Sequence, residues 1–177
     1  MPLPTEYKIK GQWAVSMVGG GATPATFTGA ASEFTIDGLE READDDRRPG
    51  AAGAISYQGD FNAMKATIKL MGITDALRDA CMESVCSNVT FTLSAVAENK
   101  RDACDIATFA ATLRGIILKY PIGWQFKNET AENEIVLGVN YYQDVWKGKT
   151  FEYDPDNMLW NWKGTNLWAA RKTALGM

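Results

Sequence analysis

Strict alternation of apolar and polar residues recurs along this chain and constrains its fold more than any other feature. In residues 61–71 the apolar positions are Met64, Ala66, Ile68 and Leu70, and the polar ones between them are Lys65, Thr67 and Lys69. A period of two is typical of a β-strand with one buried face. The pattern recurs near residues 7–17, 32–39, 89–95, 106–120 and 134–142. Seven or eight strands with turn signals between them predict an antiparallel β-sandwich or barrel.

Some positions in this pattern carry specific expectations. In residues 134–142, Ile135, Leu137, Val139 and Tyr141 are expected on one face, and Gly115 is expected to form a bulge or bend. Between two strands, Thr74 is expected to cap a short helix. Its apolar stripe comprises Ile73, Leu77, Cys81 and Val85. A second short helix is expected near the C-terminus, capped by Thr165 or Asn166.

Composition narrows the class of protein. The chain has 177 residues and is 46% hydrophobic, which predicts one domain over residues 1–177 with its own core. A formal net charge of −4 argues against binding nucleic acid through phosphate neutralisation. The chain lacks a secretory signal and a run of about 18 apolar residues, so cytosolic synthesis and no membrane partner are expected. It has no histidine, and no catalytic site, metal or cofactor is expected.

An extended charged loop is predicted at residues 40–51, because this stretch has no apolar periodicity and ends in a turn dipeptide. Its charged residues include Arg41, Asp44, Asp45, Asp46, Arg47 and Arg48. It is interpreted either as a solvated surface loop or as an arm that becomes ordered against a partner. The three aspartates suggest calcium, but the glycine and distal glutamate of a calcium loop are missing.

The three cysteines are Cys81, Cys86 and Cys104. Without histidine they do not complete a zinc site. Cys81 and Cys86 would diverge by about 140° around a helix, and Cys104 is expected to face about residue 95 across a hairpin. A bridge within the chain is therefore geometrically awkward. Either all three are free thiols, or one pair, involving Cys104, links neighbouring subunits in an oxidising exterior.

The C-terminal stretch carries a specific combination of residues. It contains Asp154, Asn157, Met158, Gly164, Leu167, Arg171, Leu175 and Gly176. In this run the chain resembles the major tail tube protein of contractile-tailed phages. The middle of the chain also fits that family, because Arg47 and Gly50 precede a strand, a short helix from Thr74 and another strand. The chain departs from the family in its acidic loop and in Trp160, Trp162 and Trp168.

The resemblance implies a β-sandwich or half-barrel whose sheet completes a continuous β-barrel in a hexameric ring. Rings would stack into the inner tube of a contractile tail, with the sheath protein outside and the tape measure protein and then DNA in the lumen. Closing a sheet across subunits removes exposed edges, and a contact that does not close along the axis yields a filament. A neutral or acidic lumen would not retain DNA.

The resemblance also implies a location and roles for the charged residues. The protein would be a structural virion component, made and assembled in the bacterial cytoplasm. The loop would reach adjacent subunits and rings, where its arginines pair with acids and its aspartates with Lys or Arg. The tube of a DNA-free contractile injection particle or secretion system is the related alternative.

Two other classes of function are compatible with parts of the sequence. Trp160 and Trp162 share one strand face, which would suit sugar stacking in a carbohydrate-binding module. Packing in the core or against a neighbouring subunit is the simpler interpretation of these tryptophans. Asp154 and Asp156 resemble a hydrolase carboxylate pair, but two acids around a proline are more typical of a turn.

Overall fold

Strands make up most of the chain in the computed structural model, which describes residues 7–18, 25–26, 31–46, 55–72, 74–99, 104–121 and 133–176. The strands in these ranges are β1 (Tyr7–Val18), β2 (Ala25–Thr26), β3 (Ala31–Ile36), β4 (Arg41–Asp46), β5 (Ile55–Phe61), β6 (Lys65–Leu70), β7 (Val89–Asn99), β8 (Ile106–Lys119), β9 (Asn133–Trp146), β10 (Lys149–Asp154), β11 (Leu159–Trp162) and β12 (Thr165–Asn166). The helices are α1 (Asp75–Glu83) and α2 (Ala169–Ala174). The expected class, mainly β with two short helices, is confirmed.

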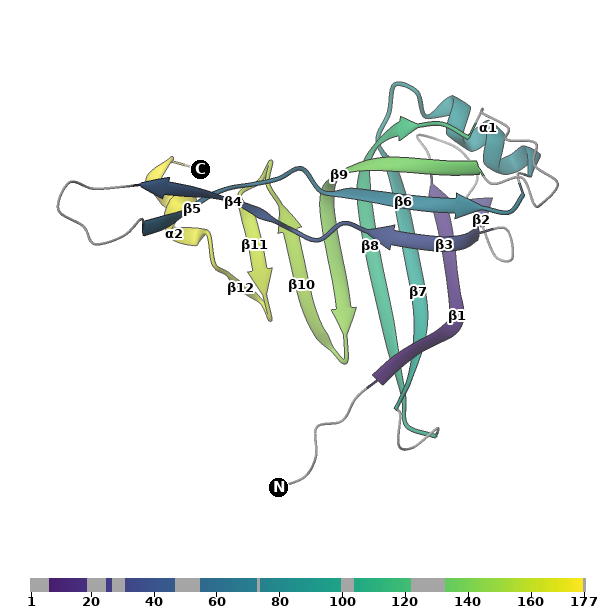
Figure 1. Cartoon of the computed structure of the whole chain (residues 1–177), viewed down its shortest axis with the longest axis horizontal. Helices are drawn as coiled ribbons and strands as arrows, with labels where there is room; N and C mark the ends of the chain where they lie inside the picture. The colour runs from purple at the N-terminus through teal and green to yellow at the C-terminus, as the bar shows by residue number, and fades with distance from the viewer. Residues whose placement is uncertain are drawn as a thin grey trace.

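Ten strands form one open antiparallel sheet, in which β12-β11-β10-β9-β8-β7-β1-β2 is the main path. β6 and β3 branch from it because β9 changes partner along its length. Residues 133–138 of β9 pair with β6, and residues 142–146 pair with β10. β8 pairs with both halves of β9. β8 and β9 thus run through two layers, and β3 and β6 cross the long strands in Figure 1. This arrangement is consistent with the expected half-barrel or sandwich.

The two layers join at a bend near Gly115. The register between β8 and β9 shifts between Arg114 and Gly115, as expected for a bulge at this glycine. A Cβ atom added to Gly115 would lie 1.9 Å from the carbonyl oxygen of Gly138. Only a residue without a side chain permits this approach of two backbones.

The core lies between the two layers and follows the alternation in the sequence. Its largest fully buried side chains are Phe91, Met17, Ile68, Leu70, Leu77, Leu113, Ile135, Leu137, Val15, Val89 and Cys81. The residues of 61–71 and 89–95 that were expected to face inward are all buried. Burial of such apolar side chains supplies the main driving force for folding.

One predicted strand face is wrong in its last residue. Ile135, Leu137 and Val139 are buried as expected, but the next buried side chain of β9 is Tyr142 and not Tyr141. Arg114 pairs with Tyr141 and Gly115 with Val139, so Asn140 is an extra residue on β9. An extra residue reverses which side chains point to which face of a strand.

Helix α1 is capped as predicted and covers the end of the layers where β6 ends and β9 begins (Figure 1). The Thr74 hydroxyl oxygen accepts a hydrogen bond of 3.3 Å from the amide of Leu77. Leu77, Ala80 and Cys81 are buried beneath the helix. The predicted stripe is wrong at Val85, which is 63% exposed because the helix ends at Glu83. Ile73 lies outside the described residues.

The predicted start of the second helix is also wrong. Thr165 and Asn166 form β12, and α2 begins only after Trp168. The side chain of Asn166 is used elsewhere, because its Oδ1 atom accepts hydrogen bonds from the amides of Trp160 (3.1 Å) and Trp168 (2.9 Å). Neither helix in the described ranges is long and apolar enough to cross a membrane.

Candidate assembly surfaces

The charged segment predicted as a loop contains a strand. β4 pairs with β5 in a separate two-stranded antiparallel sheet, here called the arm, with Arg41 opposite Phe61 and Asp46 opposite Ile55. The loop prediction is therefore wrong for residues 41–46. The arm projects from the body at the end opposite α1 (Figure 1). Asp44, Asp45 and Asp46 are in its first strand, while Arg47 and Arg48 lie outside the described residues.

Arg41 packs on aromatic rings at the base of the arm. Its guanidinium carbon lies 4.1 Å from the centroid of the Phe61 ring and 6.0 Å from that of Trp160. A cation over an aromatic face is attracted by the quadrupole of the ring. The predicted pairing of Arg41 with an acid of a neighbouring subunit stays a prediction.

Five aromatic residues, here called the aromatic cluster, connect the arm to the end of the main sheet and to the C-terminal segment. They are Phe61, Phe151, Tyr153, Trp160 and Trp168. The rings of Phe61 and Trp160 are stacked at 4.8 Å, and those of Trp160 and Trp168 lie 5.5 Å apart. Trp160 is therefore covered, whereas Trp162 is 44% exposed. The two tryptophans do not form the free platform that sugar binding would need.

The C-terminal motif builds two tight turns. Asp154 is buried and accepts two hydrogen bonds from Asn157, one from its amide (3.1 Å) and one from its side chain (2.7 Å). Met158 completes this turn with a φ of 50°, and Gly164 adopts a φ of 83° in the next turn. Asp154 therefore stabilises a turn, as expected for acids flanking a proline.

The remaining motif residues lie after the second turn. Leu167 donates its amide to the carbonyl oxygen of Trp160 at 2.8 Å, and its side chain is exposed. Arg171 is in α2, and Leu175 follows the helix with an exposed side chain. The structure thus collects the motif at one end of the main sheet, beside the base of the arm (Figure 1).

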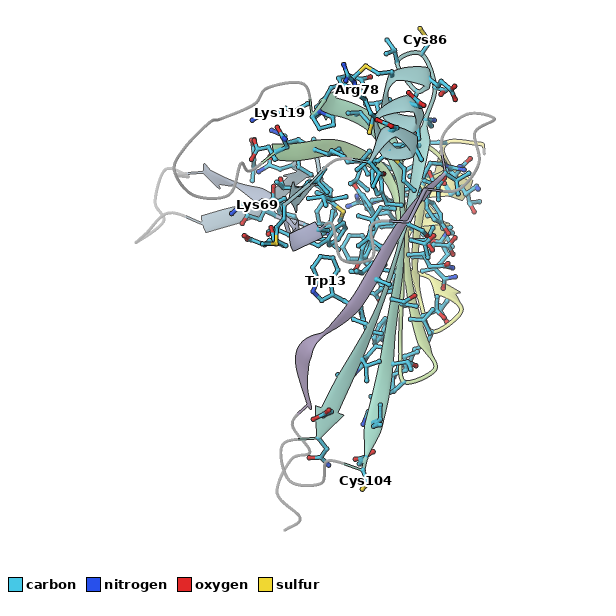
Figure 2. All side chains as sticks on the ribbon, turned by 90° about the vertical axis from the view of Figure 1, so that its right-hand side faces the viewer. Trp13, Lys69, Arg78, Cys86, Cys104 and Lys119 are labelled. Atoms are coloured by element: carbon cyan, nitrogen blue, oxygen red, sulfur yellow. The ribbon has the colours of Figure 1, made fainter. Side chains whose placement is uncertain are left out.

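The main sheet has one face without a second layer, here called the open face. Figure 2 shows the β3–β6 layer, marked by Lys69, on one side of the long strands only. On β1, β7 and β8 the open face carries hydroxyl-bearing or small apolar side chains: Ala14, Ser16, Thr90, Thr92, Ser94, Val96, Thr108, Ala110 and Thr112. These side chains are uncharged, and Glu98 places one carboxylate on the same face at the end of β7.

Arg114 brings a positive charge to the open face, and neighbouring groups compensate it. Its guanidinium lies 5.1 Å from the centroid of the Tyr141 ring and 4.0 Å from Asp154 Oδ2. Tyr141 donates its hydroxyl to Glu152 at 2.9 Å. Burial, followed by this contact with Glu152, raises the pKa of Tyr141 to about 12. Sequence reasoning missed this group because its members come from three strands whose register no local pattern reveals.

Both ends of the main sheet are only partly covered. β2 pairs with Ser16 and Met17 of β1, so residues 7–15 have no strand on that side within the described ranges. At the other end, β12 pairs with Asn161 and Trp162 of β11. Unpaired strand edges present backbone donors and acceptors to which another chain can add.

Cys81 is in α1 and Cys86 closely follows that helix, whereas Cys104 lies at the other end of the long strands (Figure 2). Cys81 is buried, and burial raises the pKa of its thiol to about 11. Cys86 and Cys104 are exposed at opposite ends of the molecule, as Figure 2 shows. A bridge between these two within one chain is excluded by their positions. A link between subunits stays a prediction. In the described part of the chain, no group of three or more Cys, Asp or Glu could hold a metal ion.

The fold is thus an open antiparallel sheet with a projecting arm and, in the described residues, partly unpaired edges. A family model described as phage tail tube protein FII matches residues 24–176, so this chain belongs to the phage tail tube protein family. The family is one of structural proteins of the virion. The expected resemblance is thereby confirmed.

The comparison with solved structures supports the same fold. A chain in the 6-fold symmetrised cryo-EM structure of the anti-feeding prophage baseplate is similar to this protein, with a TM-score of 0.51 and 15% sequence identity. The match covers 82% of this chain and 97% of that chain. A search of curated proteins found no match.

Proposed function

We propose that this protein forms hexameric rings that stack into the inner tube of a contractile tail. The observation that carries the proposal is the open ten-stranded sheet, whose backbone at both ends is only partly paired within the described residues. Joining the β1 edge of one subunit to the β11–β12 edge of the next would continue the sheet from copy to copy. Such a head-to-tail contact closes into a ring when the rotation between subunits allows it. Membership of the tail tube family supports this assembly.

The open face would line the bore of the tube. Its hydroxyl-bearing and small side chains offer no charge to a phosphate backbone, Glu98 at the end of β7 would repel it, and Arg114 lies 4.0 Å from Asp154 Oδ2. A surface of this kind supports passage of DNA without retention, because nucleic-acid affinity comes largely from cations that displace counterions. The sheath protein would contact the outside of the tube, and the tape measure protein would fill the bore before DNA.

The arm would contact an adjacent subunit, in the same ring or in the next. Its length and its projection from the body support this role (Figure 1). Arg41, Arg47 and Arg48 would pair with acids of the neighbour, and Asp44, Asp45 and Asp46 with basic residues. The exposed side chains of Leu167 and Leu175 would be covered in the same assembly.

Electron microscopy and sedimentation of the purified protein test the assembly. We expect rings of uniform diameter containing six subunits, and tubes at higher concentration. A protein that sediments as a monomer at every concentration and shows no polymer would overturn the proposal. Particles isolated with their contents then separate the two kinds of tail. DNA in the particle supports a phage tail, and a particle without DNA supports the injection device.

A further inference from the structure

We infer that the aromatic cluster is a joint that holds the arm in a fixed direction before assembly. The arm emerges between β3 and β6, and it forms a sheet of its own that shares no strand pairing with the main sheet in the described residues. A two-stranded hairpin is only marginally stable alone in water. Backbone hydrogen bonds from Asp37 N to Lys65 O and from Asn62 N to Glu40 O (both 2.9 Å) join the two connecting segments to each other. They do not join the arm to a further strand of the body, so its direction also depends on side-chain packing at its base.

The packing at that base involves the last residue pair of the arm. Arg41 and Phe61 are opposite each other in the β4–β5 register. The guanidinium of Arg41 covers one face of the Phe61 ring at 4.1 Å, and Trp160 stacks on Phe61 at 4.8 Å with an interplanar angle of 29°. Arg41, Phe61 and Trp160 thus contact one another, and this contact joins a residue pair of the arm to a residue of the main sheet.

The C-terminal segment closes the same cluster. The ring of Trp168 lies 5.9 Å from that of Phe61 and 5.9 Å from that of Tyr153. Asn166 fixes Trp168 relative to Trp160, because its side-chain oxygen accepts hydrogen bonds from both backbone amides. The arm, the edge of the main sheet and the segment before α2 therefore meet in one packed unit.

A fixed arm has a consequence for assembly, and this part of the inference rests on the proposed function. An arm that is ordered in advance loses less conformational freedom on binding a neighbour. Without the cluster, the arm would remain attached through residues 37–40 and 62–64, where backbone hydrogen bonds pair Asp37 with Lys65 and Asn62 with Glu40, but its direction would vary more widely. The C-terminal segment would then influence assembly through the arm and not by touching the neighbour.

The test compares Trp168→Ala with Trp162→Ala. The control residue is a tryptophan two positions after Trp160 on β11, and it makes none of the ring contacts of the cluster that the structure shows. We expect Trp168→Ala to accelerate amide hydrogen exchange in β4 and β5 of the monomer at least about tenfold, while the exchange in β7 and β8 stays unchanged. Trp162→Ala should leave the arm as in the parent, and Trp168→Phe should restore most of the protection.

Assembly provides the second measurement. The critical concentration for tubes should rise about tenfold in Trp168→Ala and much less in Trp168→Phe. Arg41→Gln changes an exposed residue at the other side of the cluster, so it tests the joint even if Trp168→Ala fails to fold. It should also accelerate exchange in the arm. Unchanged hydrogen exchange in the arm of both variants would show that the aromatic cluster does not hold the arm in place. If the parent forms no tubes, the proposed function fails, while the exchange measurements still decide the inference.

Discussion

At the scale of single residues, Gly115 should be highly intolerant of substitution. A Cβ atom there would lie 1.9 Å from the oxygen and 2.8 Å from the carbon of the Gly138 carbonyl group. Both are backbone atoms, so the clash cannot be relieved by turning a side chain. We expect Gly115→Ala to lower the free energy of unfolding by about 3 kcal/mol or to prevent folding. Urea unfolding measures the loss.

The matched control for Gly115 is Gly72→Ala. A Cβ atom on Gly72 would have nothing within 4 Å, and this glycine precedes α1 without a positive φ. The substitution should change the free energy of unfolding by no more than about 0.5 kcal/mol. Equal losses in the two variants would contradict the close approach of β8 and β9.

The three thiols should react at very different rates. Cys86 and Cys104 are exposed, whereas Cys81 is 0% exposed and has a pKa raised to about 11 by burial. Because the thiolate is the reactive form, we expect a colorimetric thiol reagent at pH 8 to label two cysteines quickly and the third only after unfolding. The double variant Cys86→Ser, Cys104→Ser should show no fast phase. A fast phase in that variant would place Cys81 at the surface.

The predicted link between subunits is tested on intact particles. Non-reducing gels, run after free thiols are blocked by alkylation, would show a dimer band if Cys104 is bridged to a neighbour. The Cys104→Ser variant is the control and should give monomer only. Monomer bands from the parent would exclude a covalent link.

Asp144 should make the stability of the fold depend on pH. It accepts a hydrogen bond of 2.9 Å from the Tyr142 hydroxyl, yet burial raises the pKa of its carboxyl group. The folded state then binds this proton more tightly than the unfolded state. Above the folded-state pKa the carboxyl group is ionised in both states, and its burial lowers the free energy of unfolding. Below the unfolded-state pKa it is protonated in both states, and this loss of stability disappears. Asp144→Asn should therefore gain stability relative to the parent at pH 7, and the gain should shrink towards pH 3. Thermal unfolding at both pH values checks the sign.

At the scale of elements, the strands that could be predicted are those with one buried face. In β6 and β7 the alternation of the sequence reports burial directly, and both predictions are confirmed. β4 could not be found in this way, because its sequence, READDD, has no apolar alternation and its conformation depends on pairing with β5. Tyr142 replaced Tyr141 in the core because the bulge at Asn140 is set by the register with β8.

The arm is the element whose removal should separate folding from assembly. Replacing residues 41–48 by a short Gly-Ser linker should leave the circular dichroism of the body intact and prevent stacking of rings. Its exposed ion pairs would contribute only ~0–1 kcal/mol each, but every subunit of a tube repeats them. A variant that forms tubes as well as the parent at the same salt concentration would show that the arm is dispensable.

A variant with a neutral arm tests whether the charges of the arm contribute to assembly. The triple substitution of Asp44, Asp45 and Asp46 by Asn keeps the length of the hairpin. If ion pairs with a neighbour are formed, the critical concentration of the parent should rise with salt and that of the neutral variant should depend on salt much less. An equal dependence on salt in both proteins would show that these aspartates form no ion pairs in the interface.

At the scale of the whole molecule, the candidate site was predictable only where it is local in sequence. The C-terminal motif was found through its resemblance to the tail tube family, which is visible because its residues lie in one continuous stretch, and Asp154, Asn157 and Gly164 do form turns. The aromatic cluster was not found, because Phe61 meets Trp160 and Trp168 only after the sheet has formed. The open face required the strand order and register, which alternation alone does not supply.

A cation on the open face tests the proposed bore. Thr112→Arg adds an unpaired positive charge to the middle of β8, and Thr67→Arg adds the same charge to the outer side of β6 as a control. Tubes of Thr112→Arg should retain double-stranded DNA in a salt-dependent manner, since each phosphate contact adds about 0.9 to the slope of log K against log salt. Ejection assays should then show slower release for Thr112→Arg only. Equal behaviour of the two variants would mean that the open face does not line the bore.

The paired strands β7 and β8 also determine how the molecule would carry a mechanical load. They share ten residue pairs in register, and β8 continues past the bend into the second layer. Hydrogen bonds in an antiparallel ladder lie across the strands, so a pull along the strands shears many of them together, while a pull across the sheet opens them one after another. The subunit should therefore be stiff along its long strands and yield first at β2 and β12, where two residue pairs hold each edge in the described part of the chain.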